Sequence, residues 1–245
     1  MLITSLNNSM IKQLVKLKEK KYRDLNNEFF IEGEDLCTIA YEKRYLKQIY
    51  IIEGYDNPYK NVPCTYITKE IMKKISDMES ISPYFGICSK KEETQVGNKI
   101  IILDDIQDPG NLGTIIRSAV AFNFDTIVLS EWTVDLYNPK VIRSTKGMLF
   151  KINIILRDIP SFIKELTDYQ IYGTDVIKGV DIKNENIPSK LAIIIGNEGR
   201  GISEEIRSLC HKFIYIKMNN ECESLNAGVS ASILMYEVNN KWNTF

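Results

Sequence analysis

Residues 193–201 read Ile193-Ile194-Ile195-Gly196-Asn197-Glu198-Gly199-Arg200-Gly201. Three β-branched residues run directly into a segment with three glycines, which predicts a buried strand that opens into a loop. Glycine adopts positive φ angles readily and lets another group come close to the bare backbone. Because ligands of open α/β sheets bind beyond the carboxyl ends of the strands, we expect a binding site at this loop.

The residues that precede this stretch alternate between expected strands and helices, which is typical of an α/β fold. Ile100–Leu103 is a continuous apolar run, as expected of a strand buried on both faces of a parallel sheet. Asn111 stands where an N-cap belongs, and the apolar residues after it recur at helical spacing. With Thr126–Leu129 as the next strand, this part of the chain forms a βαβ unit.

The C-terminal part continues the same alternation. We expect strands at Ile152–Leu156, Gln170–Tyr172 and Phe213–Met218. Ser224 is the expected N-cap of a last helix, Leu225–Lys241, whose first turns are rich in small residues. Small residues at a helix start allow the close approach of another backbone, which a simple surface helix does not need.

The N-terminal part is predicted to be a separate small α/β unit. Lys90–Lys99 is polar and contains a glycine, so we place a domain boundary there and predict domains at residues 1–95 and 99–245. A helix expected after Ser9 carries Lys12 and Lys16 on its polar side, with more basic residues beyond it. Such a stripe is either a solvated helix face or a surface that contacts RNA phosphates.

Composition limits the class of protein. The chain has 245 residues, 44% of them hydrophobic, a net charge of −1 and a pI near 6.0, so a packed core is expected and global charge gives no hint of nucleic acid. Five scattered cysteines and the single histidine, His211, predict neither a disulfide framework nor a metal site. No signal peptide or membrane-spanning run is apparent, so we expect a soluble, cytoplasmic protein.

Three polar clusters follow expected strands. The glycines in them match neither the dinucleotide pattern GxGxxG nor the phosphate loop GxxxxGK[ST]. The clusters are Asn111-x-Gly113-x-x-x-Arg117, the loop Gly196–Gly201, and Ser224-Leu225-Asn226. In this order and near these separations, they resemble the three motifs of the SpoU (TrmH-type) RNA ribose 2′-O-methyltransferases, of the SPOUT superfamily. The segment Asn138–Arg143 also looks like this family, and the N-terminal unit is similar in layout to its ribosomal-protein-like RNA-binding domain.

The resemblance implies a homodimer whose C-terminal domain is a trefoil-knotted, parallel-sheet methyltransferase domain that binds S-adenosylmethionine in the knot. The residues it implies for cofactor binding are Thr174, Gly196, Asn197, Gly199, Ile216, Met218, Leu225 and Ala227. No metal is implied.

Catalysis in this family is methyl transfer to a ribose 2′-hydroxyl, which requires alignment of nucleophile, methyl group and leaving sulfur. The catalytic residues implied by the resemblance are Asn111, Arg117, Glu198, Ser224 and Asn226. The residues predicted to contact RNA are Lys12, Lys16, Arg23, Lys140 and Arg143. We expect Arg117 to orient the hydroxyl and the adjacent phosphate, since a guanidinium hardly gives up its proton. Whether it serves its own subunit or the partner's is left open.

Two other interpretations remain at this point. One is a non-catalytic RNA-binding or ribosome-assembly factor that kept the fold, and the other is a methyltransferase of the same superfamily that acts on a ring nitrogen. The intact Asn111, Arg117, Glu198 and Asn226 favour catalysis. The sequence does not say whether rRNA or tRNA is the substrate, or which nucleotide is modified.

Overall fold

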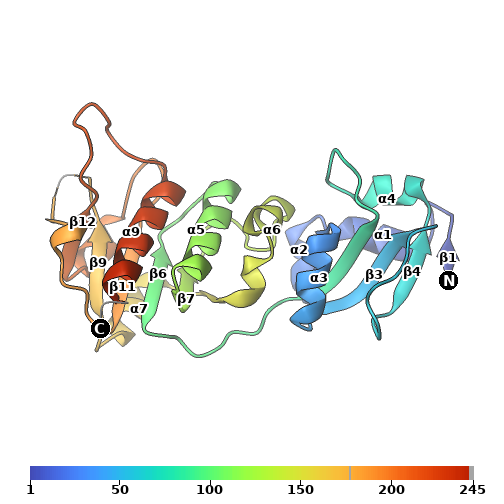
Figure 1. The fold of residues 1–245 in the computed structure, drawn as a ribbon, viewed down its shortest axis with the longest axis horizontal. Helices are drawn as coiled ribbons and strands as arrows, with labels where there is room; N and C mark the ends of the chain where they lie inside the picture. The colour runs from blue at the N-terminus through green and yellow to red at the C-terminus, as the bar shows by residue number, and fades with distance from the viewer. Residues whose placement is uncertain (177, 243–245) are drawn as a thin grey trace. The chain divides into compact units, whose positions relative to one another are not determined.

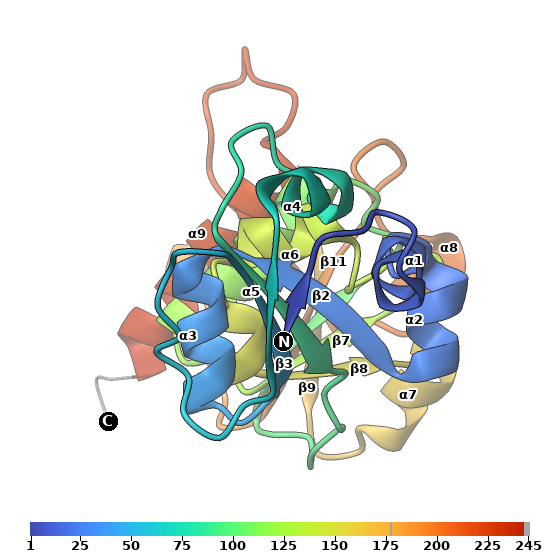
Figure 2. The same ribbon diagram turned by 90° about the vertical axis from the view of Figure 1, so that its right-hand side faces the viewer.

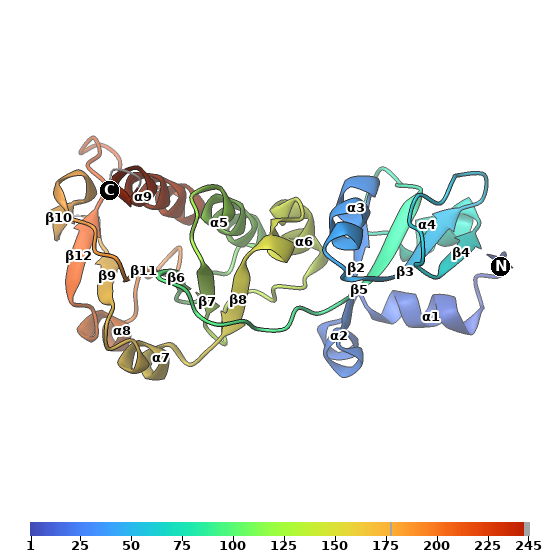
Figure 3. The same ribbon diagram turned by 60° about the horizontal axis from the view of Figure 1, so that its bottom comes forward.

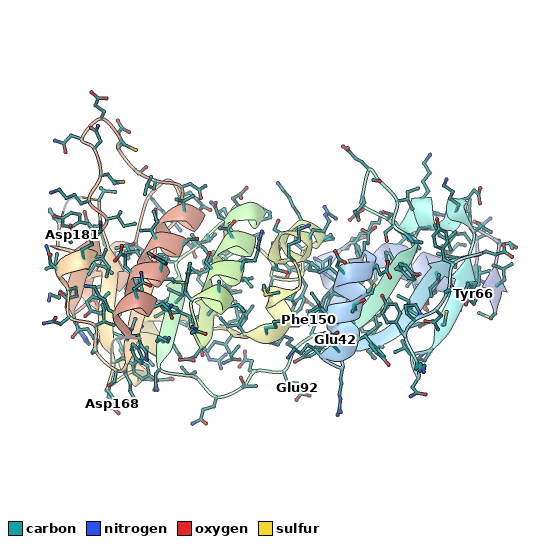
Figure 4. All side chains as sticks on the ribbon, in the orientation of Figure 1. Glu42, Tyr66, Glu92, Phe150, Asp168 and Asp181 are labelled. Carbon is teal, nitrogen blue, oxygen red and sulfur yellow. The ribbon has the colours of Figure 1, made fainter. Side chains whose placement is uncertain are left out.

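The computed structural model describes residues 1–176 and 178–242, which divide into two compact units. The first unit contains Met1–Glu92 together with Asp135–Phe150, and the second contains Glu93–Val134 together with the chain from Lys151 onward. Figure 4 labels Glu92 and Phe150, where the two parts of the first unit end. The units therefore differ from the predicted ranges 1–95 and 99–245 in two respects, because the boundary falls after Glu92 and residues 135–150 belong to the first unit.

The first unit is built on a mixed sheet with the order β1-β4-β3-β5-β2 among the described residues. Its strands are β1 (Leu2–Ile3), β2 (Glu28–Glu32), β3 (Leu46–Ile52), β4 (Cys64–Ile67) and β5 (Tyr84–Ser89). Its helices are α1 (Ser9–Lys16), α2 (Lys20–Asn26), α3 (Glu34–Glu42), α4 (Lys69–Ile75) and α6 (Pro139–Thr145), followed by the 3₁₀ turn η1 (Met148–Lys151). Apolar residues of α1 and α4 pack into one core cluster with the sheet residues Phe30, Tyr50 and Phe85.

Residues 135–150 join the first unit through charge and aromatic contacts. The Asp135 carboxylate pairs with the Arg23 guanidinium at 2.5 Å. The Tyr137 ring lies 4.6 Å from the ring of Phe29, and Phe150 stacks on the same phenylalanine at 6.1 Å. Because aromatic pairs add to ordinary apolar burial, these contacts explain why the segment belongs to this unit.

The second unit is a parallel sheet with the strand order β10-β12-β9-β11-β6-β7-β8 among the described residues. Its strands are β6 (Lys99–Leu103), β7 (Thr126–Leu129), β8 (Asn153–Leu156), β9 (Gln170–Thr174), β10 (Val180–Asp181), β11 (Leu191–Ile195) and β12 (Lys212–Tyr215). Its helices are α5 (Pro109–Ala121), α7 (Ile159–Glu165), α8 (Glu204–Ser208) and α9 (Ala227–Trp242), with the 3₁₀ turn η2 (Ile182–Asn184). The predicted α/β class with a parallel sheet is confirmed.

Helices cover both faces of this sheet. α5 and α9 lie together on one face, and α7 and α8 lie on the other (Figure 3). β11 and β6, in the middle of the sheet, are buried along their whole length, which is why both read as continuous apolar runs. The loop that leaves β11 therefore starts from a strand in the buried centre of the sheet.

Several predicted element ends are corrected by the structure. The N-cap of α5 is Asp108 rather than Asn111, because Pro109 fills the first helical position and the Asp108 side chain accepts from the backbone N–H of Asn111 at 2.9 Å. Likewise α9 begins after Asn226, whose side-chain oxygen accepts from the N–H of Val229 at 3.2 Å, so Ser224 is not its cap.

Similar corrections apply elsewhere along the chain. Asn8, rather than Ser9, caps α1, with its side-chain oxygen 2.9 Å from the N–H of Met10. β12 ends at Tyr215, three residues earlier than predicted, because the chain turns there into the long segment that leads to α9. Among residues 1–176 and 178–242, no helix combines the length and the apolar character needed to cross a membrane.

Candidate functional site

A hollow of about 660 Å³ opens at the carboxyl ends of β9, β11 and β12 in the second unit. We call it the donor hollow. Its walls are the end of β9, the loop Gly196–Gly201, the segment Ile216–Asn226 and the start of α9. Every residue predicted to bind the cofactor lines it, namely Thr174, Gly196, Asn197, Gly199, Ile216, Met218, Leu225 and Ala227.

The wall formed by Gly196–Gly201 is held by hydrogen bonds. The backbone groups of Asn197 and Gly201 bond each other in both directions, at 3.0 and 2.9 Å. The Asn197 side chain donates to the backbone oxygen of Asp105 at 2.8 Å and accepts from the N–H of Gly199 at 3.0 Å. These bonds fix the loop against the chain that leaves β6.

Gly196 shows why glycine is needed at the start of this loop. A Cβ atom placed there would lie 2.2 Å from the carbonyl carbon of Gly201 and 2.3 Å from the nitrogen of Ile202. Both are backbone atoms, so no side-chain rotation relieves the clash. The glycine therefore serves the close approach of the loop's two ends, as well as leaving bare backbone at the hollow.

Glu198 joins the loop to the first turn of α5. Its carboxylate accepts from the backbone N–H groups of Gln107 and Asp108 at 3.2 and 3.1 Å, and from the Asn111 side chain at 3.0 Å. Partial burial acts to raise the pKa of Glu198, but the hydrogen bonds from Asn111, Asp108 and Gln107 outweigh it and hold the pKa below its ordinary value. An ionised carboxylate at a helix N-terminus is also favoured by the helix dipole. The first and second motifs are thus joined through one anion.

The opposite wall is the segment between β12 and α9, which projects as a long loop (Figure 2). The hydrogen bonds within this segment are local, such as that from the N–H of Glu221 to the Asn219 side chain at 3.0 Å. Ser224 is exposed, and Asn226 ends the loop by capping α9. Both line the donor hollow with Glu198, so three of the five predicted catalytic residues meet there.

Arg117 is not brought to the donor hollow of its own chain. It is exposed on α5 and does not line the hollow. α5 and α9 run side by side (Figure 1), joined by the hydroxyls of Ser118 and Ser232 at 2.7 Å and the rings of Phe122 and Tyr236 at 5.6 Å. The arginine therefore belongs to the outer face of this helix pair.

The residues predicted to contact RNA all lie in the first unit. Lys12 and Lys16 are exposed on α1, and Lys140 is exposed on α6. Arg143, also on α6, is half-buried, and its Nη1 has no hydrogen-bond partner among the described residues.

Arg23 corrects the prediction for this surface. Its side chain is buried, donates to the backbone oxygens of Leu17 and Lys18 at 2.8 and 2.7 Å, and pairs with Asp135. A guanidinium with these partners holds the first unit together and is not available to a phosphate. It appeared basic and exposed in the sequence because its partner is more than a hundred residues away.

The segment that leaves β6 contributes site residues that lie outside the three polar clusters. Asp105 has a φ of 61° and forms an ion pair with Arg200. Gln107 and Asp108 supply the backbone donors to Glu198. Asp108-Pro109 was the available signal, since an acidic cap followed by proline is typical of a helix start. Among the described residues, no cluster of three or more His, Cys, Asp or Glu side chains is placed to hold a metal ion.

Comparison with known proteins adds to this geometry. Residues 98–236 match the SpoU rRNA Methylase family, and residues 8–85 match the MRM3-like substrate binding domain. The chain is 32% identical to the 23S rRNA (guanosine(2553)-2′-O)-methyltransferase RlmP of Bacillus subtilis over 96% of its own length and 98% of that protein. The chain belongs to the SpoU rRNA methylase family.

Solved structures of the family have the same fold over nearly the whole chain. A crystal structure of an RNA 2′-O ribose methyltransferase has a TM-score of 0.84 at 27% identity, covering 99% of this chain and 100% of that one. An AdoMet-bound rRNA methyltransferase from Sinorhizobium meliloti has a TM-score of 0.86 at 23% identity, covering 98% and 97%. As a member of the family, the chain is an S-adenosylmethionine-dependent methyltransferase that acts on a ribose 2′-hydroxyl of RNA.

The donor hollow fits this cofactor. Its volume of about 660 Å³ lies within the range of small-molecule sites, roughly 300–1,000 Å³. Backbone groups of the Gly196–Gly201 loop and the small residue Ala227 leave room for a ligand, while Ile216, Met218 and Leu225 supply apolar contacts.

Proposed function

We propose that the substrate is 23S ribosomal RNA and that the methylated nucleotide is a guanosine equivalent to the one named for RlmP. The support is identity of 32% along almost the full length of both chains, with both units represented. Such a role implies a location with ribosomes or their precursors, in the cytoplasm.

The residues of the donor hollow are proposed to make different contacts with S-adenosylmethionine. S-adenosylmethionine, when bound, supplies an electrophilic methyl group on a sulfonium. Gly196, Asn197 and Gly199 present backbone to it on the rigid wall, and Thr174 closes the end of β9. Asn111 and Glu198 are positioning residues in this scheme, because their mutual hydrogen bond ties α5 to the loop.

Arg117 is proposed to act in the donor hollow of a partner subunit. The observation that carries this is its exposure on α5, away from the hollow of its own chain. Val229 and Tyr236 of α9 are 45% and 47% exposed on the neighbouring helix, so the pair offers apolar surface to a second copy. In the homodimer, the guanidinium would orient the 2′-hydroxyl and its adjacent phosphate, which is a positioning task worth a large share of the rate.

The first unit is proposed to bind the RNA. Its match to a substrate binding domain and the exposed Lys12, Lys16 and Lys140 support this, since lysines attract phosphate without sequence preference. Arg143 is the remaining candidate on α6.

We also propose that the C-terminal part is knotted, with Phe213–Leu225 threaded through a loop of the second unit. The sheet order supports it, because β12 lies between β9 and β10, two strands that precede it in the chain. Stretching the protein from both ends should give a contour shorter than that of a fully extended chain of the same length. A full-length contour would contradict the knot.

The test of the proposed function is a methyl-transfer assay with labelled S-adenosylmethionine and in vitro transcribed 23S rRNA, followed by mapping of 2′-O-methyl nucleotides. Label in a guanosine ribose is the expected result. Label in a base, or in transfer RNA alone, would overturn the assignment.

A further inference from the structure

Trp132 is an exposed aromatic side chain of the second unit that has no role in the proposed function. It follows β7, and its indole is 72% exposed. An exposed aromatic residue by itself needs no explanation. The residues around Trp132, however, indicate that it binds a ligand.

An open hollow of about 460 Å³ lies beside the indole. It is lined by Asp105, Gln107, Trp132, Asn197 and Arg200, and we call it the base hollow. Asn197 and Arg200 also line the donor hollow. The two hollows therefore adjoin across the Gly196–Gly201 loop, as the base and ribose sites of one nucleotide must.

The chemistry of the base hollow selects a flat, neutral, polar-edged ligand. Its only charged side chains, Asp105 and Arg200, pair with each other. The rest of the lining is one indole and the carboxamides of Gln107 and Asn197. Aromatic faces stack on nucleobases, and carboxamide and guanidinium groups hydrogen-bond their edges.

The backbone of Trp132 is tied to the chain that borders the donor hollow. The Gln107 side chain donates to the backbone oxygen of Trp132 and to that of Asp105, the latter at 3.2 Å. The backbone N–H of the same Gln107 donates to Glu198, which belongs to the rigid wall of the donor hollow. A base stacked on Trp132 would thus have a defined position relative to the methyl donor.

Edge groups remain for a ligand. Within residues 1–176 and 178–242, no hydrogen bond is made to the side-chain oxygen of Gln107, and the Arg200 side chain, 63% exposed, bonds only Asp105. One acceptor and several donors match a base edge that both donates and accepts, as guanine does.

A neighbouring hollow shows where the phosphate backbone would not run. It shares Asp105, Trp132 and Arg200 with the base hollow, and it adds four carboxylates and one further cation, namely Asp104, Glu131, Asp158, Glu205 and Arg157. The carboxylates would repel phosphates, so a neutral base can approach the indole there but an RNA backbone is disfavoured.

We propose that the base hollow receives the nucleobase of the nucleotide to be methylated, extruded from its RNA stack and placed on Trp132, with Gln107 and Arg200 at its edge. This subsite rests on the proposed function and adds the recognition of the base to it. Extrusion brings the adjoining ribose to the donor hollow.

Fluorescence tests stacking without altering Trp132. The chain has two tryptophans, so Trp242→Phe leaves Trp132 as the only one. Titration with a 23S rRNA fragment that carries the target guanosine should quench its emission to saturation. A fragment with an abasic target nucleotide should bind, by filter retention, with little quenching. Equal quenching by both fragments, or none by either, would overturn the subsite.

Kinetics gives the second test. Trp132→Ala should raise KM for the RNA roughly ten- to a hundredfold, as expected for the loss of one base–aromatic stack. KM for S-adenosylmethionine should stay unchanged, and Trp132→Phe should recover most of the loss. Leu156→Ala, which removes an exposed apolar side chain of the second unit, 56% exposed and outside both hollows, is the matched control and should have no effect. An unchanged KM for RNA in Trp132→Ala would refute the proposal.

The two proposals fail in different ways. Ribose methylation by the parent enzyme without base-dependent quenching would refute the base subsite but not the proposed function. Base-dependent quenching without ribose methylation would refute the proposed function but support a nucleobase-binding site.

Discussion

The donor hollow and the outer face of α5 and α9 belong to the same unit but differ in how complete they are. The hollow gathers all the predicted cofactor-binding residues of one chain, and its rigid wall is fixed by the Asn197–Gly201 backbone pair and by Glu198. The helix face exposes Arg117 and two half-exposed apolar residues, Val229 and Tyr236, outside the donor hollow, and Tyr236 also packs against Phe122 of α5. We therefore expect donor binding to require one chain, whereas the proposed chemistry requires two.

This difference separates two kinds of substitution. Changes in the hollow should affect donor binding, and changes on the helix face should affect methyl transfer while donor binding survives. Each prediction below tests whether the two regions can be separated in this way.

The largest effect is expected at the helix face. Arg117→Ala should lower kcat/KM by about a hundred- to a thousandfold, because a group that orients the reacting hydroxyl is lost. Donor affinity, measured by calorimetry, should stay within a factor of about two, since Arg117 does not line the hollow. Loss of donor affinity in parallel with activity would break the comparison.

The next effect is expected at the rigid wall. Gly196→Ala should weaken donor binding roughly ten- to a hundredfold, because the added Cβ forces the loop ends apart. Gly199→Ala also adds a Cβ to the hollow but leaves the loop closed, since this Cβ would meet only the Asn197 side-chain oxygen, at 3.7 Å, so its loss of donor affinity should be smaller. Equal losses in the two variants would show that loop closure is not the cause.

A third prediction concerns how Glu198 contributes to the free energy of unfolding. Its folded pKa lies below the ordinary value, so its contribution to stability is present above the unfolded pKa, near 4.3, and is lost as pH falls through the folded pKa. Glu198→Gln should lower the free energy of unfolding at pH 7 by at most about 1 kcal/mol, because the carboxylate is exposed and solvent screens its interactions, and it should remove this part of the acid dependence. Denaturant unfolding between pH 3 and 7 measures both, and an unchanged acid slope in Glu198→Gln would argue against the assignment.

The smallest effects are expected in the first unit. Replacing Lys12, Lys16 and Lys140 singly by alanine should each reduce the slope of log affinity for RNA against log salt concentration by about 0.7–0.9. Lys69→Ala, an exposed lysine of α4, should leave the slope unchanged. Arg23→Ala should instead destabilise the fold, because its buried partners lose their donor. A slope change in Lys69→Ala as large as in Lys12→Ala would leave no defined RNA surface.

The parts of the fold that follow from local pattern could be predicted from sequence. Continuous apolar runs predicted β6 and β11, and two of the three polar clusters, Gly196–Gly201 and Ser224-Leu225-Asn226, predicted which loops line the hollow. The ends of helices were harder to predict. Asn111 and Ser224 are both favourable cap residues, but the structure uses Asp108 and Asn226 as caps instead. The cap of α5 depends on Pro109, and the cap of α9 depends on the loop that lines the hollow.

Long-range pairing could not be predicted. Arg23 appeared to be a surface residue until residues 135–150 returned to the first unit and supplied Asp135. Likewise, Asp105 and Gln107 gain significance only because β6 and β11 are neighbours in the sheet, which brings their loops together. Nothing in the local sequence specifies such partners.

Complementation tests the central claim that one subunit supplies Arg117 to the donor hollow of the other. Arg117→Ala and Gly196→Val, each inactive alone, would be mixed, allowed to exchange subunits and assayed for methyl transfer. In the mixed dimer, the Arg117→Ala subunit keeps an intact hollow and its partner keeps the arginine, so one complete site forms. We expect the mixture to recover up to about a quarter of the parent activity. A mixture that forms mixed dimers but stays inactive would contradict the account.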